Sequence, residues 1–249
     1  MAVAGSPRDR LVRLEREVHV WLARPDAMRD PARRAACGAV LSAEESARHR
    51  RLRSEPGRHL YLVAHALVRS ALSHYASVPP ECWSFEANRF GRPAIVGPAE
   101  GPPQLQFNLS HTPGLAACVV TRGCDCGVDV ECTDRRRDPL TVARRVLSPD
   151  EYADLTRRPR AQQRDRFFVY WTLKEAYVKA RGMGMALPLR DASFRVDGDR
   201  IEIDVEGKTD RAWQFTSIQP TPRHLLAVAV RAETLCRKVV LHEWTPETG

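Results

Sequence analysis

Several features that would assign the chain to a membrane, a secretory or a disulfide-rich class are missing. No uninterrupted apolar stretch approaches the roughly 18 residues that a membrane-spanning helix needs. No apolar segment precedes the charged residues near the N-terminus, so a secretory signal is not expected. The seven cysteines form an odd set without paired C-x-x-C spacing, which argues against a zinc site or a disulfide framework. We therefore expect a cytoplasmic protein that does not bind membranes.

Lysine is also scarce. Only four of the 39 basic side chains are lysines, and two of them, Lys174 and Lys179, lie five residues apart. Arginine is thus the general cation of this chain, and a lysine needs a specific reason. The formal net charge of +8 favours an anionic partner, which is a nucleic acid, a phosphate-bearing small molecule or an acidic protein. RNP-type aromatic motifs, zinc-finger spacing and a basic heptad region are absent, so the nucleic-acid alternative has little support.

The helix-start signals occur twice. Ser42 with Glu45, and Ser148 with Glu151, both have the spacing of a capping box. A long helix is predicted after each signal, and short apolar runs typical of strands follow both helices. The helices are predicted to run from the Pro56-Gly57 pair to about Tyr75 and within 163–181, and the apolar runs cover 115–121 and 225–231.

This duplication predicts an α+β fold with two similar subdomains related by a pseudo-two-fold axis. Each subdomain would hold a long helix packed on a small sheet. The expected boundaries are 1–122 and 123–249. Because ligand sites often form where two similar units meet, we expect the active site between the subdomains.

Two carboxylates are expected on one side of a predicted strand over 127–131. Residues two apart in a strand project to the same face, which places Asp129 beside Glu131. On a half-buried strand such a pair repels itself unless a positive group lies between them, and a hard divalent cation is the usual one. The alternative is a solvent-facing polar side of an edge strand.

The second predicted long helix presents a third carboxylate. Phe168, Trp171, Glu175 and Lys179 follow one another at intervals of three or four residues and therefore share a helix face. An exposed Glu–Lys pair is the alternative. However, the aromatic neighbours indicate a buried face, and a compact ammonium delivers its charge to one oxygen, which a guanidinium does not do.

Two polar segments of the first half suit phosphate groups. Ser110 and His111 come at the end of an apolar strand, where we expect a polar turn. The turn Asn88–Pro93 carries two arginines that suit phosphate binding or adenine stacking. Each segment alone is explained equally well as an ordinary surface turn.

Taken together, GVDVE, the helix motif W-x-x-K-E-A-x-x-K, NLSH, a G-R-P turn and an E-E-x-x-R helix resemble the 4′-phosphopantetheinyl transferases. The resemblance is to the double-length, surfactin-synthetase-activating branch. It implies transfer of the phosphopantetheine arm from coenzyme A to a serine of an apo carrier protein, releasing adenosine 3′,5′-bisphosphate. It also implies Mg²⁺, or Mn²⁺ in its place, with the metal ligands Asp129, Glu131 and Glu175.

The resemblance assigns further roles. Glu175 and Lys179 would be catalytic, with Glu175, directly or through a metal-bound water, as the base and Lys179 neutralising the diphosphate. The sequence has Arg92 where lysine is frequent in the family, a change expected to be mild, and Glu45 where a basic residue is often found. The residues expected to contact coenzyme A are Arg48, Arg89, Gly91, Arg92, Pro93, Ser110, His111, Asp129 and Lys179.

The implied partners are acidic acyl or peptidyl carrier domains, for example of polyketide or nonribosomal peptide synthesis in secondary metabolism, and the chain is expected to act as a monomer without nucleic acid. Three alternatives stay open at this point. They are a Mg²⁺-dependent phosphohydrolase acting on a nucleotide, a basic nucleic-acid-binding protein and a noncatalytic scaffold that binds carriers.

Overall fold

The computed structural model describes residues 5–98, 104–134, 140–184, 188–232 and 236–246. Helices and small sheets alternate along the chain, which confirms the predicted α+β class. By their contacts the residues form two compact units, and each is described by itself below. The first unit comprises Met1–Ala87, Pro93–Gly123 and Arg237–Gly249, and the second comprises Asn88–Arg92 and Cys124–Cys236.

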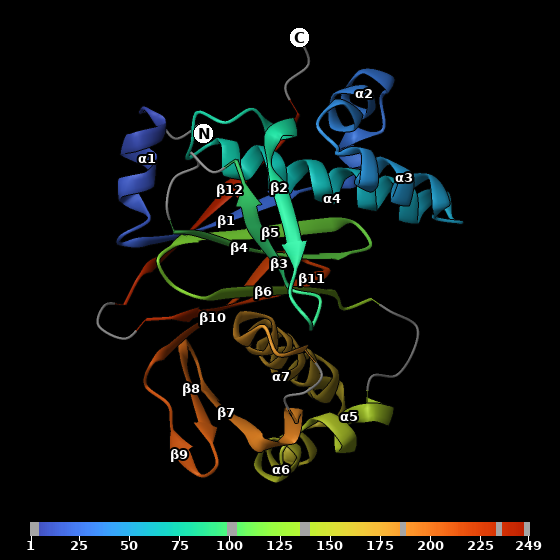
Figure 1. Ribbon diagram of the computed structural model, residues 1–249. Helices are drawn as coiled ribbons and strands as arrows, with labels where there is room; N and C mark the ends of the chain where they lie inside the picture. Colours follow the sequence, from blue (N-terminus) through green and yellow to red (C-terminus); the bar gives the residue numbers. More distant parts are fainter. Residues whose placement is uncertain (1–4, 99–103, 135–139, 185–187, 233–235, 247–249) are drawn as a thin grey trace. The chain divides into compact units, whose positions relative to one another are not determined.

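The first unit is built on a four-stranded sheet with the order β12-β1-β5-β4. Its central strands are antiparallel, whereas the last strand of the chain lies parallel to β1 at the edge. The long helix α4 packs on this sheet (Figure 1), and apolar side chains of the helix and the sheet form one core. The bounds are β1 (Glu17–Ala23), β4 (Leu105–Thr112), β5 (Leu115–Arg122), β12 (Lys238–Glu243) and α4 (Glu55–Ser73).

Shorter elements complete the first unit. The capping box predicted at Ser42 and Glu45 is present at the start of α3, and a second one, which the sequence analysis did not identify, starts α1 at Ser6 and Asp9. The short elements are α1 (Pro7–Arg13), η1 (Pro25–Met28), α2 (Pro31–Ala39), α3 (Ala43–Arg51), η2 (Pro80–Cys82), β2 (Ser84–Ala87) and β3 (Pro93–Gly97).

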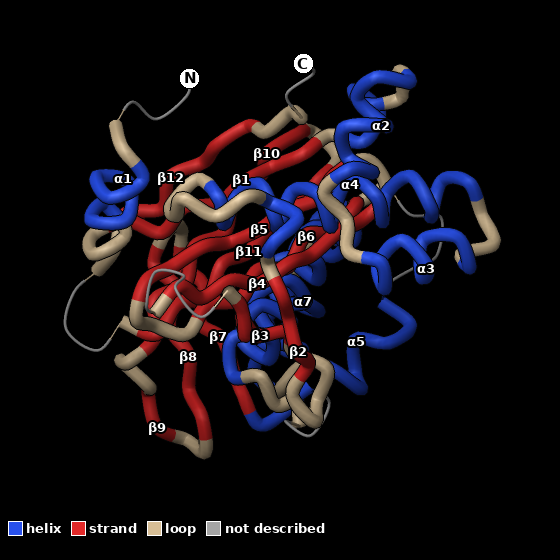
Figure 2. Tube along the Cα trace, turned by 45° about the horizontal axis from the view of Figure 1, so that its top comes forward, coloured by secondary structure: helices blue, strands red, loops and turns tan. Residues whose placement is uncertain are grey.

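The second unit has a three-stranded antiparallel sheet in the order β10-β11-β6, on which the helix α7 packs. A separate small sheet, β7-β8-β9, follows α7 in the chain; Figure 2 separates helices and strands by colour. The bounds are β6 (Cys126–Cys132), α5 (Leu140–Val146), α6 (Pro149–Arg157), α7 (Arg160–Arg181), η4 (Leu189–Asp191), β7 (Ala192–Asp197), β8 (Arg200–Val205), β9 (Lys208–Thr209), β10 (Trp213–Thr221) and β11 (His224–Arg231).

Glycine allows β6 and α7 to approach closely. A Cβ atom built on Gly127 would lie 2.5 Å from the backbone nitrogen of Ala180 and closer still to the carbonyl oxygen of Ala176. No side chain fits in this space, so the strand that carries Asp129 lies directly against the helix that carries Glu175. The contact fixes the distance between β6 and α7, the two elements that carry the candidate functional groups.

Each unit therefore combines one long helix with a sheet, as the duplication predicted. Two segments group differently from the predicted boundaries: 88–92 belongs to the second unit, and 237–249 to the first because β12 pairs with β1. The exact subdomain limits, the pseudo-two-fold axis and a site between the subdomains stay predictions. Within the described ranges no helix combines the length and apolarity that crossing a membrane requires.

Candidate functional site

An ion pair joins β6 to α7 in the second unit. The Nζ atom of Lys179 donates to Oδ1 of Asp129 at 2.7 Å and to the carbonyl oxygen of Val128 at 3.2 Å. Asp129 is buried, whereas the side chain of Lys179 keeps 27% of its surface exposed. The predicted helix face of Glu175 and Lys179 therefore does lie against the strand with the paired carboxylates.

Glu131 and Glu175 belong to the same cluster. Oε1 of Glu131 accepts a hydrogen bond from the indole Nε1 of Trp171 at 3.0 Å. Burial raises the pKa of Glu175, and the nearby negative charges of Asp129 and Glu131 raise it further, while Lys179 acts in the opposite direction. Like charges shift each other's pKa only when they are close, so the three carboxylates form one electrostatic group.

The donor chemistry of this group suits a hard divalent cation, which prefers carboxylate oxygens. The arrangement is not a ready-made metal site, however. Over the described ranges, no group of three or more His, Cys, Asp or Glu side chains is placed to hold a metal ion as it stands. Asp129 instead contacts the ammonium of Lys179. The roles of Asp129, Glu131 and Glu175 as metal ligands therefore stay predictions.

A cavity of about 520 Å³ borders the cluster within the second unit. It combines residues of α7, two of the turn residues predicted to contact coenzyme A and one arginine of α5 that the sequence analysis did not identify. Its lining thus includes two cations, Arg92 and Arg145, in addition to Glu175 and Lys179. The lining residues include Gly91, Arg92, Arg145, Trp171, Glu175, Lys179 and Leu189.

Arg92 has a structural role in addition to lining the cavity. Its Nη1 atom donates to the carbonyl oxygen of Ala180 at 2.6 Å and to Oδ1 of Asp125 at 3.3 Å. It therefore satisfies one of the last carbonyls of α7, which have no partner within the helix. Its Nη2 atom is buried without a hydrogen-bond partner among the described residues, and is thus a donor that an anion in the cavity would satisfy.

Other predicted turn residues lie near Arg92. Gly91 has a φ of 87°, the left-handed conformation that glycine adopts without strain. Asn88 anchors the turn, since its Nδ2 atom donates to the carbonyl oxygen of Gly182 at 3.0 Å. Arg89 is exposed, and its guanidinium lies 4.6 Å from the ring centre of Phe90. It is not among the residues that line the cavity.

Two more of the predicted residues, Arg48 and Pro93, line a different cavity of about 450 Å³ within the first unit. Glu45 also lines it, and its carboxylate is hydrogen-bonded to His65 at 2.9 Å and to Arg69 at 2.7 Å. Burial by itself raises the pKa of Glu45, but the hydrogen bonds from His65, the Ser42 amide and Arg69 outweigh it and lower the pKa to about 2. Glu45 thus closes a capping box and anchors Arg69.

Ser110 and His111 lie on β4, where they pair with Ala117 and Ala116. The sequence analysis expected them in a turn, but the strand continues through Thr112 because the backbone bonds to β5 are maintained to the hairpin. Ser110 is buried and His111 is exposed. Neither lines the two cavities described above, and their contact with coenzyme A stays a prediction.

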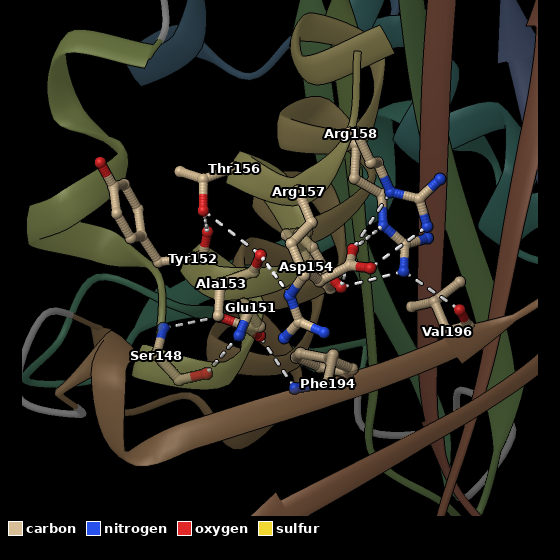
Figure 3. Close-up of polar contacts among 12 residues, drawn as sticks. Ser148, Glu151, Tyr152, Ala153, Asp154, Thr156, Arg157, Arg158, Phe194 and Val196 are labelled. Carbon is tan, nitrogen blue, oxygen red and sulfur yellow. Dashed lines mark hydrogen bonds and ion pairs between the residues drawn. The ribbon is translucent and has the colours of Figure 1, made fainter. Parts of the chain in front are cut away.

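Lys174, which precedes Glu175, is buried and points away from the carboxylate cluster. Its Nζ atom lies 2.8 Å from Oε2 of Glu151 and donates to the carbonyl oxygens of Leu189, at 2.6 Å, and Ala192. Glu151 also accepts from the backbone amides of Ser148 and Phe194 (Figure 3). The sequence marked Lys174 only as one of few lysines. Because Lys174 and Glu151 lie in different helices, 23 positions apart, no local spacing indicated that they pair.

A family model described as the 4'-phosphopantetheinyl transferase superfamily matches residues 125–229. The 4'-phosphopantetheinyl transferase HetI of Nostoc sp. is 33% identical over 224 residues, which cover 88% of this chain and 90% of that protein. The 4'-phosphopantetheinyl transferase Sfp of Bacillus subtilis is 30% identical over 161 residues, covering 65% and 69%.

A solved holo-(acyl-carrier-protein) synthase from Bacillus anthracis in complex with CoA is also similar. It shares 19% identity with a TM-score of 0.37, and the match covers 43% of this chain and 93% of that one.

Proposed function

Because the chain belongs to the 4′-phosphopantetheinyl transferase superfamily, we propose that it transfers phosphopantetheine from coenzyme A to a serine of an apo carrier protein. Adenosine 3′,5′-bisphosphate is the second product, and Mg²⁺ is required, with Mn²⁺ as a substitute. The single observation that supports this most is the grouping of Asp129, Glu131, Glu175 and Lys179 where β6 meets α7, beside a cavity.

Asp129, Glu131 and Glu175 would hold the metal ion. A metal ion held by these residues would offset negative charge on the diphosphate of coenzyme A and on the leaving bisphosphate. Carboxylates alone would repel such a substrate. A cation beside the three acidic side chains is therefore needed to bind an anionic substrate. The ammonium of Lys179, which contacts Asp129, already supplies one positive charge.

The cations of the cavity complete the binding site for an anion. Lys179 and Arg92 line the same cavity, and the Nη2 atom of Arg92 has a free hydrogen-bonding position among the described residues. Arg92 is held in place by its bond to the carbonyl oxygen of Ala180, so it needs little reorganisation to bind a phosphate. Arg145 adds a third positive charge to the lining.

Glu175 is the residue proposed to take the proton of the carrier serine. Burial and two neighbouring carboxylates raise the pKa of Glu175, but a cation held by the same carboxylate would lower it. The role of base therefore rests on the position of Glu175 and not on its pKa. Its carboxylate borders the cavity in which the reacting phosphate would be placed. Loss of the serine proton then allows the hydroxyl oxygen to attack the phosphorus atom and to displace the bisphosphate.

The net charge of +8 supports an acidic carrier as the protein substrate, because complementary charge accelerates encounter. We further propose carriers of polyketide or nonribosomal peptide synthesis, with the transferase acting as a cytoplasmic monomer. The similarity to Sfp and HetI, both of which are named 4'-phosphopantetheinyl transferases, supports the choice of a carrier substrate in general.

The test is the intact mass of purified apo carrier proteins after incubation with the protein, coenzyme A and MgCl₂. We expect a mass increase of one phosphopantetheine on the carrier, no increase with EDTA, and none on a carrier whose acceptor serine is alanine. Release of bisphosphate without any carrier, with unmodified carriers throughout a panel of acyl and peptidyl types, would instead support a phosphohydrolase.

A further inference from the structure

The ammonium of Lys179 occupies a position that a metal ion would need. Oδ1 of Asp129, one of the proposed metal ligands, lies 2.7 Å from Nζ of Lys179. A second bond to the carbonyl oxygen of Val128, at 3.2 Å, holds the ammonium beside the strand. Lys179 thus places a positive charge beside the carboxylate cluster.

The ammonium and a divalent cation oppose each other at this carboxylate. Two positive charges a few ångströms apart repel strongly in a partly buried site. A metal ion that binds to the ligand-free chain must therefore displace Lys179 from Asp129 or bind with fewer ligands.

Lys179 has an alternative position available. Its side chain is 27% exposed and lines the 520 Å³ cavity together with Arg92 and Arg145. A diphosphate in that cavity would bring negative charge next to the ammonium. Lysine has a flexible four-carbon stem and three donors, so it can move from Asp129 to a phosphate oxygen without a change in the backbone.

We propose that Lys179 holds the metal ligand Asp129 in the ligand-free chain and releases it when a diphosphate enters the cavity. Metal ion and coenzyme A then bind as a coupled pair, and the metal binds weakly alone. This inference rests on the proposed function, since it takes the diphosphate of coenzyme A as the group that draws Lys179 away. Beyond the assignment of the metal ligands, it states that the metal ion binds tightly only together with coenzyme A.

The first experiment measures Mn²⁺ binding to the coenzyme-free protein by electron paramagnetic resonance or isothermal titration calorimetry. Lys179→Met keeps most of the aliphatic stem and removes the charge. We expect it to bind Mn²⁺ roughly 5- to 150-fold more tightly than the wild-type protein does, which is the usual range of coupling between two sites. Lys208→Met, which removes an exposed lysine of β9, should leave the affinity unchanged. Equal Mn²⁺ affinity in Lys179→Met and wild type would overturn the inference.

A second experiment needs no variant that alters the site. Because the chain has only four lysines, protein labelled with ¹³C-lysine gives four resolvable sets of side-chain signals. Adding coenzyme A should shift the Lys179 signal, whereas MgCl₂ alone at a concentration that saturates the complex should not. A full shift by MgCl₂ alone would contradict the inference.

Failure of this inference is distinguishable from failure of the proposed function. A protein that modifies apo carriers but binds Mn²⁺ equally well in both variants is a transferase with independent metal binding. A protein that modifies no carrier in the mass assay is not the proposed enzyme, whatever its metal affinity.

Discussion

Lys174 and Glu151 form a fully buried ion pair that links α7 to α6, with 2.8 Å between Nζ and Oε2 and no exposed surface on either side chain. Burial lowers the pKa of Lys174 and raises that of Glu151, and each partner opposes the shift of the other. Two backbone carbonyls and two backbone amides satisfy their remaining donors and acceptors. Adjacent lysine and glutamate residues in α7 thus have different tasks: Lys174 fixes the helix, and Glu175 faces the cavity.

Removing one partner of this pair should destabilise the protein strongly. We expect Lys174→Met to lower the free energy of unfolding by about 3–5 kcal/mol, because Glu151 would be left buried without its countercharge. Urea unfolding followed by circular dichroism measures the loss. The exposed Lys208→Met is the matched control, with a change of about 0.5 kcal/mol or less. The double variant Lys174→Met/Glu151→Gln should lose less than the sum of the single losses; additive losses would show that the pair does not interact.

The close contact of β6 with α7 gives a second prediction. Gly127→Ala places a methyl group against the backbone of Ala176 and Ala180, which cannot move without shifting the helix. We expect a loss of about 1–3 kcal/mol or more in unfolding free energy, as for overpacked cores, and a fall in transfer activity because Glu175 shifts with α7.

Gly38→Ala is the control for this substitution. Gly38 lies in α2, is exposed and has no atom within 4 Å of its added Cβ. Alanine should be neutral there or stabilise by up to about 1 kcal/mol. Equal stability of the two variants would show that the strand and helix separate easily.

Much of this architecture was predictable from local sequence signals. The capping boxes at Ser42 and Ser148 are both present, and the long helix predicted within 163–181 is α7, Arg160–Arg181. These features depend on residues three or four positions apart, for which short-range hydrogen bonding and helical periodicity decide the outcome. The strand with Asp129 and Glu131 was predictable for the same reason, since its alternation is local.

What the sequence did not reveal depends on residues far apart in the chain. The parallel pairing of β12 with β1 joins segments more than 200 residues apart, and no turn signal links them. The pairing of Lys174 with Glu151 and of Arg69 with Glu45 likewise follows from how helices pack. Both glutamates were recognised as capping residues, but both carboxylate oxygens of each make additional contacts that spacing alone does not show.

The carboxylates of the cluster give a direct test of the chemistry. We expect Glu175→Gln and Asp129→Asn each to reduce the rate of carrier modification by about 10²- to 10⁴-fold, the usual range for a lost base, and more where metal binding is lost too. The thermal midpoint should stay near that of the wild type. Glu206→Gln, at an exposed turn of the second unit, should retain full activity. Wild-type turnover in either site variant would refute the role assigned to that residue.

Arg92→Lys should have a larger effect than the mild one expected from charge alone. The guanidinium contacts Ala180 and Asp125 simultaneously while lining the cavity, and an ammonium does not reproduce this geometry. Loss of a hydrogen bond to a charged group costs about 1.5–3 kcal/mol, so the KM for coenzyme A should rise roughly tenfold or more with a smaller change in kcat. Arg200→Lys, at an exposed position of β8 outside the predicted coenzyme A contacts, is the matched control. Identical KM values in the two variants would exclude a specific role for the guanidinium of Arg92.

Two histidines of the first unit make its stability depend on acid. Burial lowers the pKa of His74 and of His242 to about 4, and the positive charge of Arg10 contributes at His74. His242 lies stacked on Trp21 with 4.6 Å between ring centres, and Nδ1 of His74 lies 3.2 Å from Nη1 of Arg10, so both imidazoles fit as neutral rings.

In the unfolded chain a histidine takes up its proton near pH 6.5. Between about pH 6.5 and pH 4 the unfolded state therefore binds more protons than the folded state does, and the free energy of unfolding falls as the pH falls. The stabilisation by the neutral rings is complete above pH 6.5 and is lost on the way to pH 4. The free energy of unfolding, measured with urea at pH 7.5, 6, 5 and 4.5, should fall less steeply with falling pH in the variant His74→Gln/His242→Gln than in the wild type. Parallel curves for the two proteins would show that these histidines titrate alike in the folded and unfolded states.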